Sequence, residues 1–205
     1  MIELLLALSL GIGLSGMMLQ LLINESSLGL RVNRLWRERS LQHRTLELIR
    51  SDVQRASRIS TTPQLEQHAC SLAGRLPVLH LTTAAGTVTY SVGAAPSAIW
   101  RGHVLMRCGP AFDVAGKPSE TGTAQNRVVI DALAIHPEPW ADETRLIAQS
   151  GVAMKDLAGS SATAFSAMLA PDGGRIVALR LQRTFATHEM KEQLLTSEVL
   201  IGEST

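Results

Sequence analysis

The apolar run at the N-terminus constrains this chain more than any other feature. From Met1 to Ile23 the only charged residue is Glu3. About 20 apolar residues are enough for an α-helix to cross the hydrocarbon core of a bilayer. A cleaved secretory signal would show a basic head and a small-residue cleavage site, and neither accompanies the run. We therefore predict a membrane-spanning helix.

Glu3 is the residue of this helix for which we expect a function. A carboxylate inside an apolar spanning segment costs roughly 2.5 to 3.5 kcal/mol on insertion scales, so such a group usually has a partner. The alternative is that Glu3, close to the helix end, reaches the membrane interface and needs no partner.

Small residues recur along the same run. Small side chains let helix backbones approach closely in a membrane, where no hydrophobic force drives helices together. The alternative is simple tolerance, because glycine is common in spanning helices. The predicted helix-packing residues are Ala7, Gly11, Ser15, Gly13 and Gly16.

The helical pattern continues beyond the apolar run. No proline occurs before Pro63, and apolar residues recur at intervals of three and four, interrupted at Gln42, which is typical of one helix face. We predict a single helix from about Leu4 to Arg58, roughly 80 Å long. Its second half is expected to pack on the rest of the chain through Leu46, Ile49, Val53 and Ala56.

After Pro63 the sequence changes to short apolar runs rich in Val, Leu, Ile and Thr, separated by turn residues, which is typical of strands. We predict turns at Ala85-Gly86 and Asp172–Gly174 and loops around 109–126, 137–139 and 159–163. The strands are expected at Val78–Thr82, Thr87–Val92, His103–Cys108, Val128–Leu133 and Arg175–Gln182.

The predicted fold is therefore α+β, with a long N-terminal helix packed on a mostly antiparallel β head. We divide the chain into a transmembrane half of the helix (1–24), an amphipathic half (25–60) and a β-rich globular head (61–205). The head has a length usual for one domain with its own core.

Cys70 and Cys108 are the only cysteines. An even pair in an oxidising compartment favours a disulfide between the helix exit and the sheet. The alternative is two buried free thiols, which behave as small hydrophobic side chains.

The sequence contains no recognised arrangement for catalysis or metal binding. The six histidines are scattered, no CxxC spacing is present, and no nucleophile elbow, P-loop or HExxH motif occurs. We predict no catalytic residue, no metal site and no cofactor.

The N-terminal residues Ile2-Glu3-Leu4-Leu5 resemble the start of type IV pilins and pseudopilins. In that family a basic leader ending in glycine is removed and the glutamate is the fifth residue of the mature chain. We therefore expect the natural chain to begin upstream of Met1. The resemblance implies that Glu3 pairs with the free α-amino group of a neighbouring subunit.

The end of the long helix carries a second resemblance. Leu46, Asp52, Val53 and Ala56 match the pattern that closes this helix in J-type pseudopilins of type II secretion and W-type minor pilins. The resemblance implies a bacterial minor pilin or pseudopilin, with other pilins, the inner membrane and the assembly platform as partners. It also implies a single-pass inner-membrane protein with a periplasmic head that later enters a pilus or pseudopilus.

The charge pattern conflicts with this topology. The window Leu28–Arg58 holds eight arginines and three acidic residues, a net charge of +5, so the rest of the chain carries −4 of the total of +1. Arginines after a spanning helix favour a cytoplasmic head. We give more weight to the cysteines and to the expected basic leader, which would place competing charge before the helix.

Two other functions remain open at this point. The chain could be a membrane-anchored periplasmic binding module of unknown ligand, or a pilus component acting in DNA uptake. Direct nucleic-acid binding is not expected, because the arginines lie on the helix and aromatic residues make up only 3% of the chain, whereas single-stranded DNA is bound by stacking on aromatics.

Overall fold

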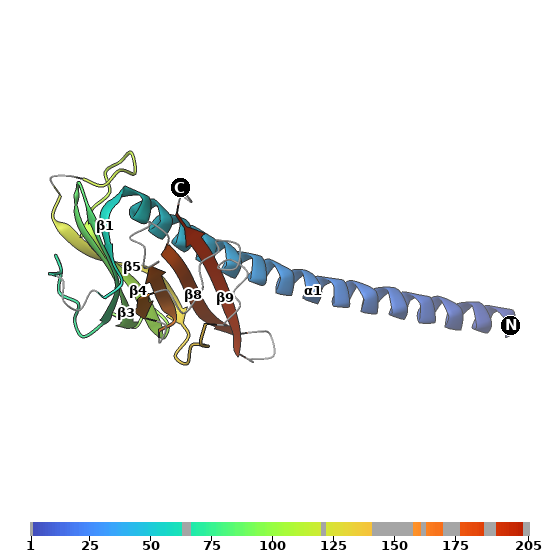
Figure 1. Cartoon of the computed structure of the whole chain (residues 1–205). Coiled ribbons are helices and arrows are strands. Elements are labelled where there is room, and N and C mark those ends of the chain that lie inside the picture. Colours follow the sequence, from blue (N-terminus) through green and yellow to red (C-terminus); the bar gives the residue numbers. More distant parts are fainter. Residues whose placement is uncertain are drawn as a thin grey trace.

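A long helix and an antiparallel sheet make up this protein in a computed structural model (Figure 1). The structure describes residues 2–62, 67–119, 122–140, 158–160, 163–169, 177–186 and 192–202. Helix α1 (Ile2–Arg55) has 54 residues; its N-terminal part projects away from the head, and its C-terminal part lies against the sheet. The coarse prediction of an α+β chain with an N-terminal helix is confirmed.

The strands of the head form one curled sheet. Its order is β1-β2-β3-β4-β5-β8-β7-β6, with β9 also paired to β8, and all the described pairings are antiparallel. The bounds are β1 (Ala56–Ser60), β2 (Leu76–Thr83), β3 (Gly86–Ala94), β4 (His103–Pro110), β5 (Ala124–Leu133), β6 (Ala158–Ser160), β7 (Phe165–Leu169), β8 (Val177–Ala186) and β9 (Glu192–Ile201).

Strand β8 organises the second half of the sheet. Strand β9 pairs along its whole length, from Val177↔Ile201 to Ala186↔Glu192. The other edge of β8 is shared: β7 pairs with one part of it, and β5 meets it at Leu133↔Arg183. This junction brings β4 and β5 into the same sheet as the C-terminal strands.

The predicted end of the helix at Arg58 is wrong. Helix α1 ends at Arg55, and Ala56 already begins β1, where Arg58 pairs with Thr82 of β2. The segment Ala56–Ser60 contains no proline or glycine that would mark a boundary. Pairing with β2 decides its conformation, because tertiary contacts override local preference. The predicted division at residue 60 therefore falls at the end of β1.

The predicted strands overlap β2, β3, β4, β5 and β8, whereas β1, β6, β7 and β9 were not predicted. The predicted turn at Ala85-Gly86 falls within one residue of the β2–β3 hairpin connection: Ala84 and Ala85 form the turn, and Gly86, at φ 126°, is the first residue of β3. The predicted turn 172–174 lies outside the described residues.

Two predicted loops are partly wrong. Residues 109–110 and 124–126 belong to β4 and β5, and residues 159–160 belong to β6. The segment 137–139 contains no strand, as predicted.

The main core lies between α1 and the sheet. It combines Ile49 and Val53 of the helix with Leu79, Tyr90 and Phe165 of the strands, and all five are almost fully buried. A smaller cluster of Trp140, Met168 and Ala178 forms a second apolar group. Burial of this large apolar area fixes the C-terminal half of the helix to the head.

Candidate functional site

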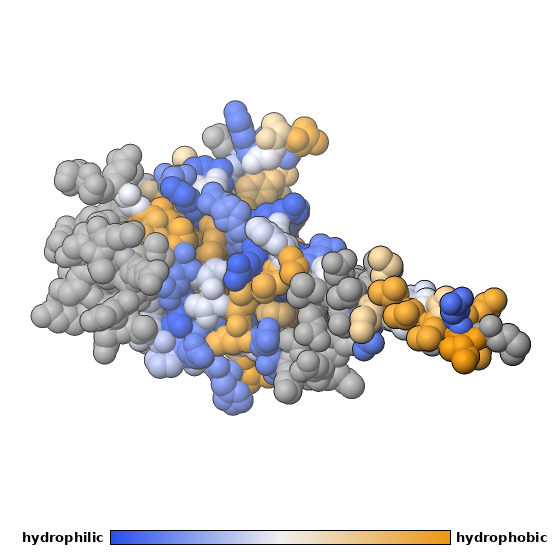
Figure 2. Space-filling view, turned by 90° about the vertical axis from the view of Figure 1, so that its right-hand side faces the viewer, coloured by the Kyte–Doolittle hydropathy of each residue, from blue (hydrophilic) through white to orange (hydrophobic). Residues whose placement is uncertain are grey.

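The N-terminal segment of α1, up to Gln20, is an exposed apolar helix. The segment Ile2–Gln20 has a mean hydropathy of 1.9 over 19 residues, and none of it is buried against the head. In Figure 2 the end of the helix farthest from the head is covered mainly by hydrophobic side chains. By length and composition this helix can span a membrane. Glu3 lies in its first turn and is exposed.

Most of the predicted small residues open a shallow groove along one side of this helix. Ala7, Gly11, Ser15 and Gly16 line it. The Ser15 hydroxyl donates a hydrogen bond of 2.8 Å to the Gly11 carbonyl, which satisfies the hydroxyl inside the helix. Gly13, predicted with this group, does not line the groove. In membranes, small side chains of this kind let helix backbones approach closely.

The second half of α1 carries the predicted apolar contact with the head. Leu46, Ile49, Val53 and Ala56 are at most 5% exposed and belong to the main core. The first three lie on α1, whereas Ala56 is the first residue of β1. The apolar stripe therefore continues across the helix-to-strand junction.

Asp52 joins α1 to two strands through a buried polar cluster. Its Oδ2 accepts hydrogen bonds from the Tyr90 hydroxyl of β3 and from Arg107 Nε of β4, each 2.7 Å long. Arg55 Nη2 lies 2.8 Å from Oδ1. Asp52 is 1% exposed, Tyr90 0% and Arg107 3%. Because the charges are paired and hydrogen-bonded, the cluster satisfies the usual condition for burying ionised groups.

The cluster shifts the pKa of each of its buried members. Burial alone would raise the pKa of Asp52, but the hydrogen bond and charge of Arg107, helped by Tyr90, lower the pKa of this carboxyl overall. Burial and the Asp52 charge raise the pKa of Tyr90 well above its ordinary value. Burial would lower the pKa of Arg107, but Asp52 raises it overall. Asp52 and Arg107 are therefore both charged at neutral pH.

A polar stripe continues this attachment toward the N-terminal end of α1. Arg34 Nη1 donates to the Ala186 carbonyl at 3.0 Å, and Glu38 pairs with Arg183 of β8, whose Nε donates to the Asp131 carbonyl. These helix residues follow each other at an interval of four, so they lie on one face.

Gln42, which appears in the sequence as an interruption of the apolar stripe, is a contact of the same kind. It is fully buried; its Nε2 donates to the Leu195 carbonyl at 2.9 Å, and its Oε1 accepts from the Ser197 hydroxyl. The side chain thus hydrogen-bonds the backbone of β9 and holds that strand against α1.

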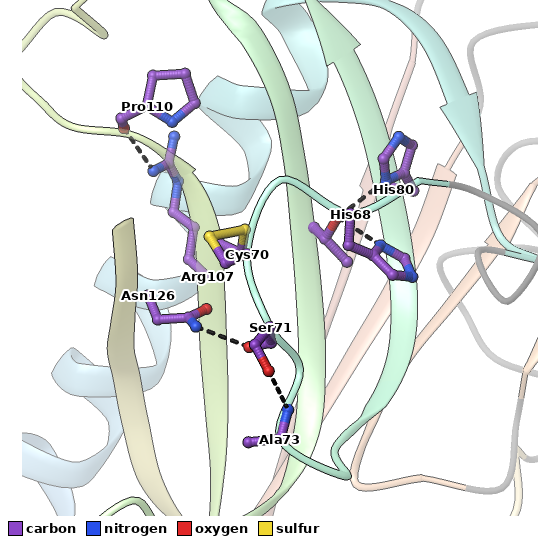
Figure 3. The surroundings of a disulfide bond; sticks show 10 residues. His68, Cys70, Ser71, Ala73, His80, Arg107, Pro110 and Asn126 are labelled. Carbon is purple, nitrogen blue, oxygen red and sulfur yellow. Dashed lines mark hydrogen bonds between the residues drawn. A yellow bond between two sulfur atoms is a disulfide. The ribbon is translucent and has the colours of Figure 1, made fainter. Parts of the chain in front are cut away.

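Cys70 and Cys108 form a disulfide in the structure (Figure 3). The bond links the segment that follows β1 to β4 across a sequence separation of 38 residues. It lies on the sheet face opposite α1, because Arg107, the neighbour of Cys108, points to Asp52 on the helix side.

Sequence reasoning missed most of the polar attachment. Asp52 was identified only as a position matching a family pattern, and Tyr90, Arg107, Glu38 and Arg183 were not singled out. One signal was available: Arg107 is the only charged residue in Val104–Cys108, and a charge within a buried strand requires a partner.

The described residues bring together no group of three or more His, Cys, Asp or Glu side chains that could hold a metal ion. No protein-family model matches this chain, and searches of characterised proteins and of solved structures also give no match.

Proposed function

We propose that this chain is a minor pilin or pseudopilin that takes part in starting or capping a type IV pilus or a type II secretion pseudopilus. The observation that carries the proposal is the division of one continuous helix into two surfaces. Ile2–Gln20 is apolar and exposed, while residues from Gln42 to Val53 include the buried contacts with the head. Such a helix places its apolar N-terminal part, which we call the stem, against lipid or other helices, while the head stays outside the membrane.

The two surfaces suit an assembly subunit better than a simple anchor. An anchor needs only hydrophobic length, whereas the rigid attachment through Asp52 and Gln42 fixes the direction in which the stem leaves the head. A fixed stem direction lets identical or related subunits dock with a constant geometry. The groove at Gly11 and Ser15 supplies a surface for the neighbouring helix.

Glu3 supplies the selective contact in this proposal. Its carboxylate pairs with the α-amino group of the adjoining subunit, at an attraction of roughly 1 kcal/mol in water for charges 4 Å apart and several-fold more where the effective dielectric is lower. Docking in register then relieves the cost of a lone charge in lipid. The head lies on the periplasmic side of the inner membrane before assembly.

A photo-crosslinking amino acid placed in the stem tests the proposal. At Ile12, which lines the groove, we expect adducts with other pilin-like subunits in cells that carry the assembly machine. The matched position is Leu6, which is exposed on the same helix but does not line the groove, and there we expect fewer protein adducts. Lipid adducts alone at both positions would contradict the proposal and favour a plain membrane anchor.

Substitution of the carboxylate gives a second test. Glu3→Ala is expected to leave membrane insertion intact and to abolish incorporation into the filament, whereas Glu3→Asp keeps the charge and retains part of the incorporation. Normal filament assembly by the Glu3→Ala chain would contradict the proposed pairing of the Glu3 carboxylate with the α-amino group of the adjoining subunit.

A further inference from the structure

A row of four side chains crosses the outer face of the sheet, which we define as the face opposite α1. His80 of β2 pairs with Thr89 of β3, Thr89 pairs with Cys108 of β4, and Cys108 pairs with Asn126 of β5. Directly opposed residues of antiparallel strands lie on the same face. The neighbour Tyr90 points to the helix side, so the row points away from α1.

Residues 67–75, which we call the strap, run across this row and are tied to it at three places (Figure 3). His68 Nδ1 lies 3.1 Å from Thr89 Oγ1, Cys70 is bonded to Cys108, and Asn126 Nδ2 donates to the Ser71 carbonyl at 2.9 Å. The three contacts fall on three successive strands. The strap therefore spans the outer face from β3 to β5.

The strap turns back into β2 at its end and rests closely on the sheet there. The Arg75 amide donates to the Leu72 carbonyl at 3.0 Å, and the turn uses Gly74 at φ 77°. A Cβ built on Gly93 of β3 would lie 3.1 Å from the Arg75 Cα. The close approach requires glycine at this position.

The disulfide is the strongest of these ties. The hydrogen bond to the Ser71 carbonyl is exposed and the one between His68 and Thr89 is only partly buried, so each contributes little net free energy to stability in water. Ordering a segment of this length costs conformational entropy at every residue. The two hydrogen bonds therefore do not offset the cost of ordering the strap, and the covalent bond decides its position.

The helix side of the sheet does not depend on the strap. Asp52, Tyr90 and Arg107 make their contacts on the opposite face, and the main core includes no residue of the strap. The contacts that attach α1 to the sheet therefore do not involve the strap.

We propose that the strap is a redox-controlled clamp: thiol–disulfide exchange at Cys70–Cys108 opens it and uncovers the outer face of β3 to β5 while the head and its attachment to α1 stay folded. The partner reagent is a dithiol reductant or oxidoreductase. Cys108 is 1% exposed, whereas Cys70 is half-buried, so the incoming thiolate attacks Cys70 Sγ.

The exchange is balanced in two steps. The attacking thiolate forms a mixed disulfide with Cys70, the original sulfur–sulfur bond breaks, and Cys108 leaves as a thiolate with the electron pair. The second thiol of the reductant then resolves the mixed disulfide, which oxidises the reductant and leaves two thiols on the protein. The proposal holds whether or not the chain assembles into a filament.

Hydrogen exchange of the full chain in detergent micelles tests the clamp, with and without dithiothreitol. We expect reduction to accelerate exchange in the strap, including the Ala73 and Arg75 amides, by on the order of tenfold or more. Peptides covering Gln42–Arg55 should keep their protection, and reoxidation should restore the strap.

Variants separate the covalent tie from the others. Cys70→Ser/Cys108→Ser should exchange in the strap like the reduced chain with or without reductant, while Asn126→Ala should stay protected as long as the disulfide is intact. If the double variant fails to fold, hydrogen exchange of the unchanged protein before reduction, after reduction and after reoxidation is sufficient to test the clamp. Two results would overturn the clamp: unchanged strap protection after reduction, or a loss of protection that extends through β2–β5 and α1.

Discussion

The Tyr90 hydroxyl donates a 2.7 Å hydrogen bond to the Asp52 carboxylate, and this bond connects β3 of the sheet to the last turns of α1. Arg107 donates to the same oxygen from β4. Three elements thus meet at one buried carboxylate, and the stability of the head should depend on it.

Replacement of Asp52 by alanine should be among the most destabilising single changes in the chain. It leaves the Arg107 guanidinium buried without its counter-charge, a change that typically costs about 3 to 5 kcal/mol. Asp52→Leu combined with Arg107→Met removes both charges and should cost much less. Urea unfolding followed by Trp fluorescence gives the free energy of unfolding of both variants. Equal losses of stability in the two would show that the unpaired arginine charge does not cause the destabilisation.

Tyr90→Phe provides a finer measure of the same cluster. The ring stays in the core, and only the hydrogen bond to a charged acceptor is lost, so we expect a cost of about 1.5 to 3 kcal/mol. The same unfolding experiment checks this. A cost near zero would mean that the carboxylate is satisfied by its arginines alone.

The lowered pKa of Asp52 predicts acid sensitivity. A carboxyl whose folded-state pKa lies below its unfolded value, about 3.9 for aspartate, contributes stability that is complete above the unfolded value and is lost as the pH falls through the folded value. The stability advantage of the natural chain over Asp52→Asn should therefore be constant from pH 7 to about pH 5 and shrink below about pH 4. A pH-independent advantage would contradict the assignment.

Glu198 should show the opposite trend. Burial raises its pKa, and the Arg180 charge compensates only in part, so the folded state favours the protonated acid and loses stability as the pH rises through the folded pKa. The stability of Glu198→Gln relative to the natural chain should consequently increase as the pH rises from about 4 to about 7. Thermal unfolding at both ends of this range checks the sign.

Gln42→Leu tests whether the polar stripe supports β9. The change leaves the Leu195 carbonyl and the Ser197 hydroxyl without their partner, which should cost about 1 to 3 kcal/mol despite the added apolar surface. Ser197→Ala in the same chain should recover part of the loss. Hydrogen exchange should show the increased opening in β9, with β2 and β3 unchanged.

The sequence predicts the apolar parts of this fold well and the polar contacts poorly. Short runs rich in Val, Leu, Ile and Thr locate β2 to β5 and β8, because residues of these types favour a pleated, partly buried strand. The sequence of β9 is interrupted by Thr196, Ser197 and Glu198 and forms no continuous apolar run, and β1 follows the helix without a boundary residue. Both strands are defined by their partners.

The candidate site divides in the same way. The exposed segment Ile2–Gln20 follows from an apolar run long enough to span a membrane, and the stripe from Leu46 to Val53 follows from hydrophobic periodicity. The contacts of Asp52 with Tyr90 and Arg107 cross sequence separations of 38 and 55 residues, and no local pattern indicates which distant strand will supply a partner. Gln42 breaks the apolar periodicity yet is fully buried, because hydrogen bonds to β9 satisfy its amide.

The direct passage from α1 into β1 has a mechanical consequence. Helix α1 ends at Arg55 and β1 begins at Ala56, with no linker between them. Tension applied along the helix therefore acts directly on the backbone hydrogen bonds between β1 and β2. The buried polar cluster of Asp52, Tyr90 and Arg107, one turn before the junction, transfers part of that force to β3 and β4. Because the force is shared between these contacts, the strands of the head should not detach from the helix one after another.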